Sequence, residues 1–343
     1  MSLPFFDAIE QYFPQSVIDI VAKETIKDLF LHHPAIHATH SFSKSHIRGL
    51  RGLLRYGQRL RQPQRSEMFF TLAPSFSSAL MGYGTGSPIR IGYRGGGRSV
   101  LLTHSWPVPV GIHRVHLYCD LLRCFYHQWQ QKGNVSSPVP SSETRKPQSI
   151  IFPFSEAEQR TPAFSRQPHT QYLVFNVNSE AQSRRLPHEK WIELANRLLA
   201  DASQRRKILF IGMAAEQQRV QKVMQGIDRQ DALSDLSGKT SLRDLAMVLR
   251  DADVVVTNDS GPMHLANAVG TPVVTFFGAG NPVETGPFNA NNAVVLNTGL
   301  KCSPCVKNNC RFPTVRCLEQ VTVDEIYDSV IRYVKNKANE NSH

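Results

Sequence analysis

The sequence lacks any long apolar run, and this absence excludes a membrane-spanning protein. No stretch of the 343 residues approaches the ~18 consecutive apolar residues that a transmembrane helix needs. The opening Met1-Ser2-Leu3-Pro4 also lacks the basic region and apolar core of a secretory signal peptide. We therefore expect the protein in the cytoplasm.

Acidic residues are scarce relative to basic ones, with 28 Asp and Glu against 39 Lys and Arg and a formal net charge of +11. Zinc-finger, helix-turn-helix and RNP patterns are all absent, so we expect no nucleic acid partner. An anionic membrane surface or a phosphorylated glycolipid would explain the charge. A generally basic surface is the simpler alternative.

Much of this charge lies between Lys44 and Arg65, where arginines alternate with leucines. The pattern predicts an amphipathic basic helix, which could lie on a membrane surface. We favour the simpler interpretation, a solvated helix face on an α/β sheet.

Short apolar, largely β-branched or aromatic runs alternate with segments of helical periodicity along the chain. In the first half, strands are expected at 17–21, 68–72 and 88–93, with helices at 3–13, 75–80 and 111–131 and another directly after the first strand. In the second half, strands are expected at 172–176, 207–212, 254–258 and 273–274, with helices at 189–200, 214–225, 242–250 and 323–335. This alternation favours α/β architecture with parallel, doubly wound sheets.

Residues 133–170 have a different composition, rich in Pro, Ser and Gln. Such a composition is typical of a linker or a loosely packed connection. We therefore predict an N-terminal domain at 1–135, a linker at 136–170, a second domain at 171–321 and a C-terminal helix at 322–343.

One stretch of the second domain predicts a ligand site. The strand Val254–Asn258 runs into Asp259 and Ser260, both good helix N-cap residues, and Gly261 and Pro262 suit a helix start. The backbone N–H groups and the positive dipole end of that helix would face the carboxyl edge of a parallel sheet, where they favour phosphate. A plain β-α-β turn without ligand is the alternative.

The stretch Asn258-Asp259-Ser260-Gly261-Pro262-Met263-His264, followed by Gly270-Thr271-Pro272-Val273-Val274 and Phe277-Gly278-Ala279-Gly280-Asn281-Pro282, resembles glycosyltransferase family 9, the ADP-heptose:lipopolysaccharide heptosyltransferases and their relatives. The resemblance covers about residues 2–335. It implies the GT-B fold, two Rossmann-like domains with parallel sheets facing across a cleft, with a C-terminal helix at 322–343 that could cross back to the N-terminal domain. It further implies an inverting, metal-independent transfer of heptose from ADP-heptose to a lipopolysaccharide inner-core or lipid A acceptor, by a monomer peripheral at the inner membrane.

The resemblance also assigns roles to individual residues. Asp259 and Arg184 would be catalytic, with Asp259 near the donor sugar and Arg184 facing the leaving group. The nucleotide sugar would be bound by Ser179 at a phosphate, Glu216 at the ribose, Thr240 beside the base, and the helix start Ser260, Gly261, Pro262, Met263 and His264. Helix capping is the alternative role for Thr240, and capping with packing is the alternative for His264.

A basic, glycine-rich loop in the first domain matches the family's acceptor side. Arg94 and Arg98 would contact acceptor phosphates or sugar acids. A surface loop with spare charge is the alternative.

The chain departs from the family at its start, because members begin with a strand and a Gly-Asp loop whose aspartate is taken as the acceptor-activating base. Here the N-terminal domain lacks that first strand, no Gly-Asp pair lies near the N-terminus, and Asp7 within the first helix is a poor substitute. Either the true start lies further upstream, which we favour, or the chain binds its donor and transfers poorly, since losing a general base costs about 10²–10⁴-fold in rate. A different nucleotide sugar is a further alternative.

Cysteine is also sparse, with six residues, yet Cys302, Cys305, Cys310 and Cys317 lie close together. Four thiols in a cytosolic protein suggest a metal before disulfides, and zinc is the default for a structural site. Reduced thiols and a local disulfide remain alternatives. No cofactor is expected to be required for catalysis.

Overall fold

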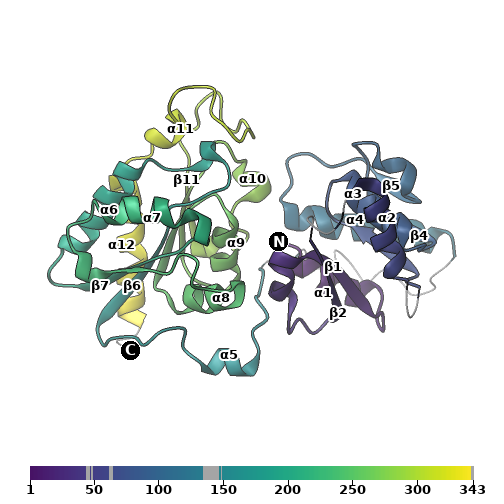
Figure 1. The fold of residues 1–343 in the computed structure, drawn as a ribbon, viewed down its shortest axis with the longest axis horizontal. Coiled ribbons are helices and arrows are strands. Elements are labelled where there is room, and N and C mark those ends of the chain that lie inside the picture. The colour runs from purple at the N-terminus through teal and green to yellow at the C-terminus, as the bar shows by residue number, and fades with distance from the viewer. Residues whose placement is uncertain (44–46, 48, 62–64, 134–146, 148, 341–343) are drawn as a thin grey trace. The chain divides into compact units, whose positions relative to one another are not determined.

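The computed structural model of the protein describes residues 1–43, 47, 49–61, 65–133, 147 and 149–340 (Figure 1). The chain forms two compact units, Met1–Pro147 and Gln148–His343. The boundary between them falls inside the stretch predicted as a linker. Several residues of the predicted segments lie outside the described ones, namely Lys44 and Arg48 of the basic stretch and Pro138 and Pro140 of the linker.

The first unit holds two small parallel sheets. One pairs β1 (Ile18–Lys23) with β2 (Ile36–Phe42), and the other has the order β3 (Met68–Thr71), β4 (Ile89–Tyr93) and β5 (His104–Trp106). The helix expected after the first strand is a 3-10 helix, Glu24–Phe30, and the strand β2 that follows it was not predicted. Pro34 disfavours the helical conformation of the residue before it, so the chain turns there and returns as a strand.

The helices of this unit begin near the predicted positions. They are α1 (Leu3–Tyr12), α2 (Gly49–Arg59), α3 (Phe76–Gly84) and α4 (Arg114–Gln131). Helix α3 starts at Ser75, whose hydroxyl accepts a hydrogen bond from the Ser78 amide at 3.2 Å. Helix α1 contacts both parts of the strand layer. Phe5 packs edge-on against Phe70 of β3, and Phe6 packs against Phe30 after β1.

The second unit is built on one six-stranded parallel sheet with the order β11-β10-β9-β6-β7-β8 (Figure 1). The strands are β6 (Thr170–Asn176), β7 (Arg205–Phe210), β8 (Leu233–Asp235), β9 (Val254–Asn258), β10 (Val273–Phe276) and β11 (Ala293–Leu296). From β6 the chain builds outward in one direction to β8, then returns to β9 on the other side of β6. In open α/β sheets, ligands bind where the order reverses, which is here between the carboxyl ends of β6 and β9.

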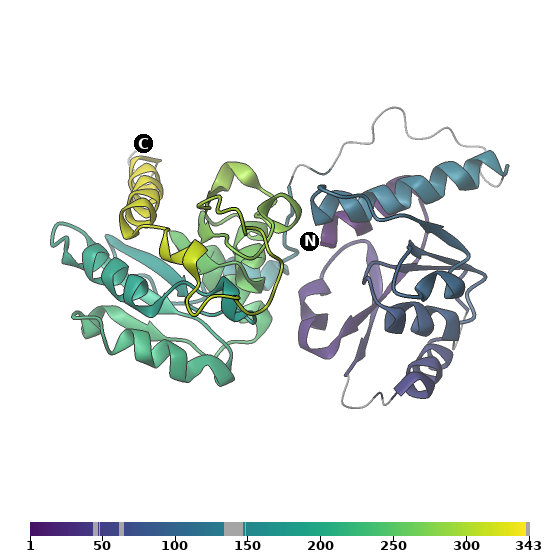
Figure 2. The same ribbon diagram turned by 90° about the horizontal axis from the view of Figure 1, so that it is seen from above.

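Helices cover both faces of this sheet, as Figure 2 shows from above. Alternate strand residues point to opposite faces, so Phe175 packs with α6 (His188–Ala200), α7 (Gln217–Met224) and α12 (Val323–Glu340). Its neighbour Val174 packs with α8 (Leu242–Asp251) and α9 (Gly261–Ala268). The short helices α5 (Glu156–Arg160), α10 (Pro282–Thr285) and α11 (Arg316–Glu319) complete the unit.

Part of the linker and the C-terminal helix of the predicted domain plan both pack on the second unit in the structure. The second half of the predicted linker is anchored to the second unit, since the Phe152 amide donates to the Ala268 carbonyl at 3.1 Å and Arg243 pairs with Glu158 at 2.5 Å. Helix α12 places Ile326 and Val330 in the core of the same unit. In the described residues, no helix is long and apolar enough to cross a membrane.

Candidate functional site

The loops that follow β6 and β9 meet at the point where the strand order reverses. Asn176, the last residue of β6, donates through its amide to Thr257 at 2.9 Å and to the Ser260 hydroxyl at 2.7 Å. The Ser179 hydroxyl donates to the Asp259 carbonyl at 3.1 Å. Two loops about 80 residues apart in sequence are therefore held together by short hydrogen bonds.

Arg184 and Asp259 face each other across these loops. The guanidinium lies 3.2 Å from the Asp259 carboxylate, and Asp259 is only 3% exposed. Burial raises the pKa of Asp259 to about 6, and the Arg184 charge opposes that rise. The pair is at ion-pair distance but lacks hydrogen-bond alignment: among the described residues, neither Arg184 Nε nor Asp259 Oδ2 has a hydrogen-bond partner. Both atoms are buried, so each keeps a hydrogen-bonding capacity that the described residues do not satisfy.

Gly280 leaves the space that the Asp259 carboxylate occupies. A β-carbon on Gly280 would lie 2.0 Å from Asp259 Oδ2, far closer than any real contact. Any other residue at 280 would displace the carboxylate. Gly280 was not among the predicted site residues, although the Gly278-Ala279-Gly280 stretch after a buried strand carried the signal.

The N-terminus of α9 is suited to an anion. Ser260 is its N-cap residue, yet its hydroxyl donates to the Asn258 carbonyl at 3.1 Å and does not cap the helix. Gly261 is exposed, and a β-carbon there would meet nothing within 4 Å. The first amides of α9 thus border open space with the positive helix dipole behind them.

Of the other predicted residues at the start of α9, one is fully buried and two are partly exposed. Met263 is fully buried in the core, where it accepts a hydrogen bond from Thr275, so only its backbone can reach a ligand. Pro262 occupies the first turn of α9, and His264 is half-buried in the same turn.

Glu216 and Thr240 follow β7 and β8 and so belong to the same carboxyl edge of the sheet. One Glu216 carboxylate oxygen accepts from the Met213 amide at 2.9 Å. The cap of α8 is Ser241, whose hydroxyl accepts from the Asp244 amide at 3.1 Å. The capping role considered for Thr240 is therefore filled by its neighbour.

Asn176 and Asn258, which were not among the predicted site residues, hold the two loops in place. Asn258 accepts from the Leu186 amide at 2.9 Å and donates to the carbonyls of Asn176 and Asn178 at 3.4 Å. The sequence signal for these two asparagines was an amide residue at the end of each of two largely apolar strands.

Arg185 donates to the Ser179 carbonyl at 2.7 Å, so its side chain supports the loop that carries Arg184.

The basic loop of the first unit uses its two arginines differently. Arg98 is buried and donates to the carbonyls of Tyr93 at 2.6 Å and Arg94 at 2.9 Å. Arg94 is exposed, and its Nε lies 3.1 Å from the Ser105 carbonyl and 3.3 Å from the Ser105 hydroxyl. The Arg98 side chain thus closes its own loop, and Arg94 is the better placed of the two to meet an acceptor.

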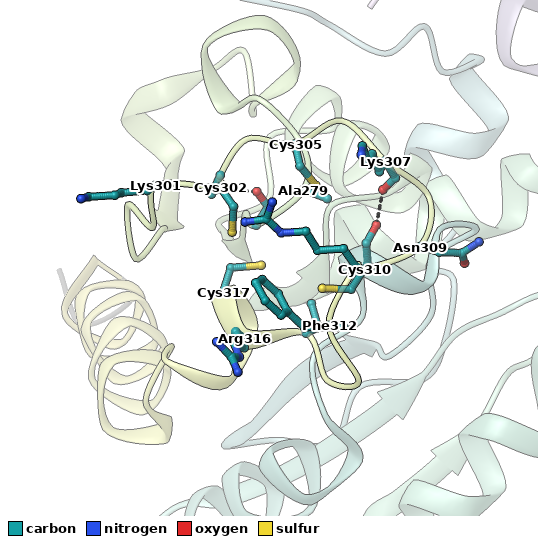
Figure 3. Close-up of a pocket in the computed structure, with 15 residues that line it drawn as sticks. Ala279, Lys301, Cys302, Cys305, Lys307, Asn309, Cys310, Phe312, Arg316 and Cys317 are labelled. Atoms are coloured by element: carbon teal, nitrogen blue, oxygen red, sulfur yellow. Dashed lines mark hydrogen bonds between the residues drawn. The ribbon is translucent and has the colours of Figure 1, made fainter.

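The four clustered cysteines line a single cavity of the second unit (Figure 3). All four are free thiols. In the part of the chain that the structure describes, no three His, Cys, Asp or Glu side chains are arranged as a metal site. The structural zinc therefore stays a prediction, which metal analysis of the purified protein would check.

Two α/β units, one of which presents a helix start and an arginine at its sheet's switch point, have the features expected of a GT-B glycosyltransferase. The family model of glycosyltransferase family 9 (heptosyltransferase) matches residues 53–316, and the chain belongs to this family.

Individual relatives agree with this assignment. The chain is 25% identical over 320 residues to lipopolysaccharide heptosyltransferase 2 of Escherichia coli K12, covering 87% of this chain and 85% of the relative. Among solved structures, E. coli ADP-heptose LPS heptosyltransferase II matches with a TM-score of 0.76 at 21% identity, over 98% of this chain and 95% of the other. The E. coli heptosyltransferase WaaC with ADP-2-deoxy-2-fluoro heptose matches with a TM-score of 0.65 at 20% identity, over 99% and 95%.

Proposed function

We propose that this glycosyltransferase moves a heptose from ADP-heptose to a lipopolysaccharide inner-core acceptor, with inversion at the anomeric carbon and without a catalytic metal. The observation that carries the proposal is the Arg184–Asp259 pair beside the open N-terminus of α9. The heptosyltransferases among the relatives, one of them solved with a fluorinated ADP-heptose, support this donor.

The donor diphosphate would lie between the two loops. Its oxygens would accept from the first amides of α9 next to Gly261, and from the Ser179 hydroxyl once that hydroxyl turns away from the Asp259 carbonyl. Arg184, whose side chain is 29% exposed, would donate through its guanidinium. The nucleoside would extend along the edge toward Glu216 after β7 and Thr240 after β8.

The transfer step is a displacement at the anomeric carbon of the heptose. An acceptor hydroxyl forms the new carbon–oxygen bond from one face while the bond to the diphosphate breaks on the other, which inverts the configuration. The bonding electrons stay on the departing ADP, and the hydroxyl proton passes to a general base. Asp259 would orient the sugar and Arg184.

Charge on the leaving ADP is the main barrier that the protein must lower. A guanidinium and a helix dipole that are already in place stabilise developing charge without reorganisation, and removing one such donor costs about 10²–10³ in rate. We propose that Arg184 and α9 together supply the positive potential that a divalent cation supplies in other transferases. Activity should then persist in excess EDTA.

We propose a peripheral place at the cytoplasmic face of the inner membrane, where a monomer would meet its lipid-linked acceptor. The net charge of +11 and the exposed Arg94 support attraction to anionic lipid and to acceptor phosphates.

Calorimetric titration of ADP-heptose and ADP tests the donor site. Arg184→Ala should lower the affinity for both ligands by about tenfold or more, which is the usual contribution of a charge-assisted hydrogen bond. Arg229→Ala is a matched control, since Arg229 is exposed on the same unit and pairs with Asp231 at 2.9 Å. Equal affinity for the wild type and Arg184→Ala would rule out this site.

Two competing hypotheses need separate measurements. Titration with UDP- and GDP-sugars tests whether another nucleotide sugar is the donor. Turnover on a truncated core acceptor tests the hypothesis that the chain binds donor without transfer. Donor affinity with turnover below the detection limit would favour a binding protein.

A further inference from the structure

A basic segment without acidic residues lies beside the proposed donor site. From residue 285 to residue 318 the sequence contains no Asp or Glu, but it contains four cations: Lys301, Lys307, Arg311 and Arg316. All four are exposed, and none is among the ion pairs of the described residues. The next acid, Glu319, accepts a hydrogen bond from Thr314 at 2.9 Å. No acidic side chain within the segment compensates these four positive charges.

Two of these cations are held close together. The guanidinium carbons of Arg311 and Arg316 lie 4.8 Å and 4.3 Å from the centre of the same Phe312 ring. They are therefore at most about 9 Å apart, so their positive charges repel each other, and an anion that contacts both would relieve that repulsion.

The segment encloses a cavity of about 350 Å³. All four cations and all four cysteines line it, together with Ser183 and Ala279, and no carboxylate does (Figure 3). A volume near the lower end of ligand pockets suits a phosphate group with part of a sugar. Burial raises the pKa of the Cys317 thiol, which keeps that group neutral and leaves the cations uncompensated.

Hydrogen bonds attach this cavity to the reaction centre. The Ser183 amide donates to the Asn308 carbonyl at 3.1 Å, and its hydroxyl donates to the Lys307 carbonyl (Figure 3). The Val306 amide also donates to the carbonyl of Ala279, a second lining residue, at 2.8 Å. Ser183 immediately precedes Arg184, and Ala279 immediately precedes Gly280, which makes room for Asp259. The cavity thus adjoins the Arg184–Asp259 pair.

We propose that this cavity binds a phosphate ester carried by the saccharide acceptor, and so makes the nucleotide-binding unit part of the acceptor site. The proposal rests on the proposed function. The site is concave and adjoins the place of transfer, so it fits a group on the acceptor rather than a flat array of lipid headgroups. Lys307 and Arg311 bind the phosphate through charge-assisted hydrogen bonds.

Acceptor kinetics test the proposal with the full-length chain. In Lys307→Gln/Arg311→Gln, the KM for a phosphorylated core saccharide should rise about tenfold or more, with kcat and ADP affinity within twofold of wild type. The same saccharide after phosphatase treatment should show the higher KM in both proteins. Lys222→Gln/Arg229→Gln removes two charges elsewhere on this unit and should leave every value unchanged. Equal effects on both saccharides, or no effect, would overturn the proposal.

Three further measurements separate other ligands. Inorganic phosphate should compete with the phosphorylated saccharide in wild type only. The double variant could bind phosphatidylglycerol vesicles more weakly than the wild type does, with unchanged saccharide kinetics. In that case the cavity binds lipid headgroups and the proposal is wrong. Stoichiometric metal that is lost in Cys302→Ser would show a thiolate metal centre in the cavity, which also overturns it.

Calorimetry of the saccharide itself covers the case in which the proposed function fails. Should the wild type transfer no heptose, binding of the phosphorylated saccharide still reports on the cavity. Binding that needs the phosphate and weakens in the double variant would support the site. Binding without that dependence would reject it.

Discussion

The guanidinium of Arg184 lies 3.2 Å from the carboxylate of Asp259, across the point where the second sheet reverses its strand order. One residue follows β6 and the other follows β9, so the pair joins the two halves of the sheet at its carboxyl edge. The unmatched hydrogen-bonding atoms of this pair are the reason to expect a ligand there.

The buried carboxylate makes stability depend on pH. The pKa of Asp259 rises from 3.8 to about 6 on folding. Between these values the folded protein keeps a proton that the unfolded chain releases, so the contribution of this group to stability falls as pH rises through that window. Asp259→Asn should therefore raise the free energy of unfolding at pH 7.5 by about 1–3 kcal/mol.

Urea unfolding of wild type and Asp259→Asn at pH 7.5 and pH 4 measures this effect. The gain should vanish at pH 4, where the wild-type side chain is protonated as well. A variant less stable than wild type at pH 7.5 would mean that the charged carboxylate stabilises the fold through Arg184.

Gly280 and Asp259 should be energetically coupled. In Gly280→Ala the new methyl group would meet Asp259 Oδ2, and overpacking of this kind costs about 1–3 kcal/mol. In an Asp259→Ala background the cost should shrink, because the colliding oxygen is gone. A double-mutant cycle by urea unfolding measures the coupling, and additive effects would show that the two side chains do not compete for space.

Substitutions at Gly261 should distinguish an effect on ADP binding from an effect on stability. A methyl group there meets nothing in the structure, so Gly261→Ala should change the free energy of unfolding by less than about 0.5 kcal/mol. The larger Gly261→Val would fill the space in front of the α9 amides, and ADP affinity should fall by an order of magnitude or more. Unchanged ADP affinity in both variants would place the diphosphate elsewhere.

The two arginines of the first unit should respond differently. Arg98→Ala leaves the carbonyls of Tyr93 and Arg94 without their donor, and should lower stability by about 1–3 kcal/mol. Arg94→Ala should leave the melting temperature unchanged and raise the acceptor KM severalfold. Thermal unfolding and acceptor kinetics distinguish the two, and a severe acceptor defect in Arg98→Ala without loss of stability would reverse these roles.

The second unit was largely predictable because its local signals agree with one another. The apolar run 254–256, the cap residues Asp259 and Ser260 and the stop at Gly270 specify a strand, a turn and a helix without reference to distant residues. The strand Ile36–Phe42 was not predictable in this way. Its histidines and small residues carry weak periodicity, and its pairing with β1 stabilises it.

Family membership was readable from short motifs, because the chemistry requires particular side chains at particular places after a strand. The two arginines at 94 and 98 looked equivalent in the sequence. Burial alone distinguishes them, and burial depends on how the loop folds back on β4.

By itself, the sequence determined the strand–turn–helix that offers α9 to an anion, since capping residues and β-branched runs act over a few positions. Only the tertiary structure decided that Arg184 meets Asp259, that Gly280 leaves the room for it, and that a basic cavity adjoins the pair. These relations join segments 20 to 130 residues apart, and the pairing order of the strands, which no local pattern encodes, brings them together.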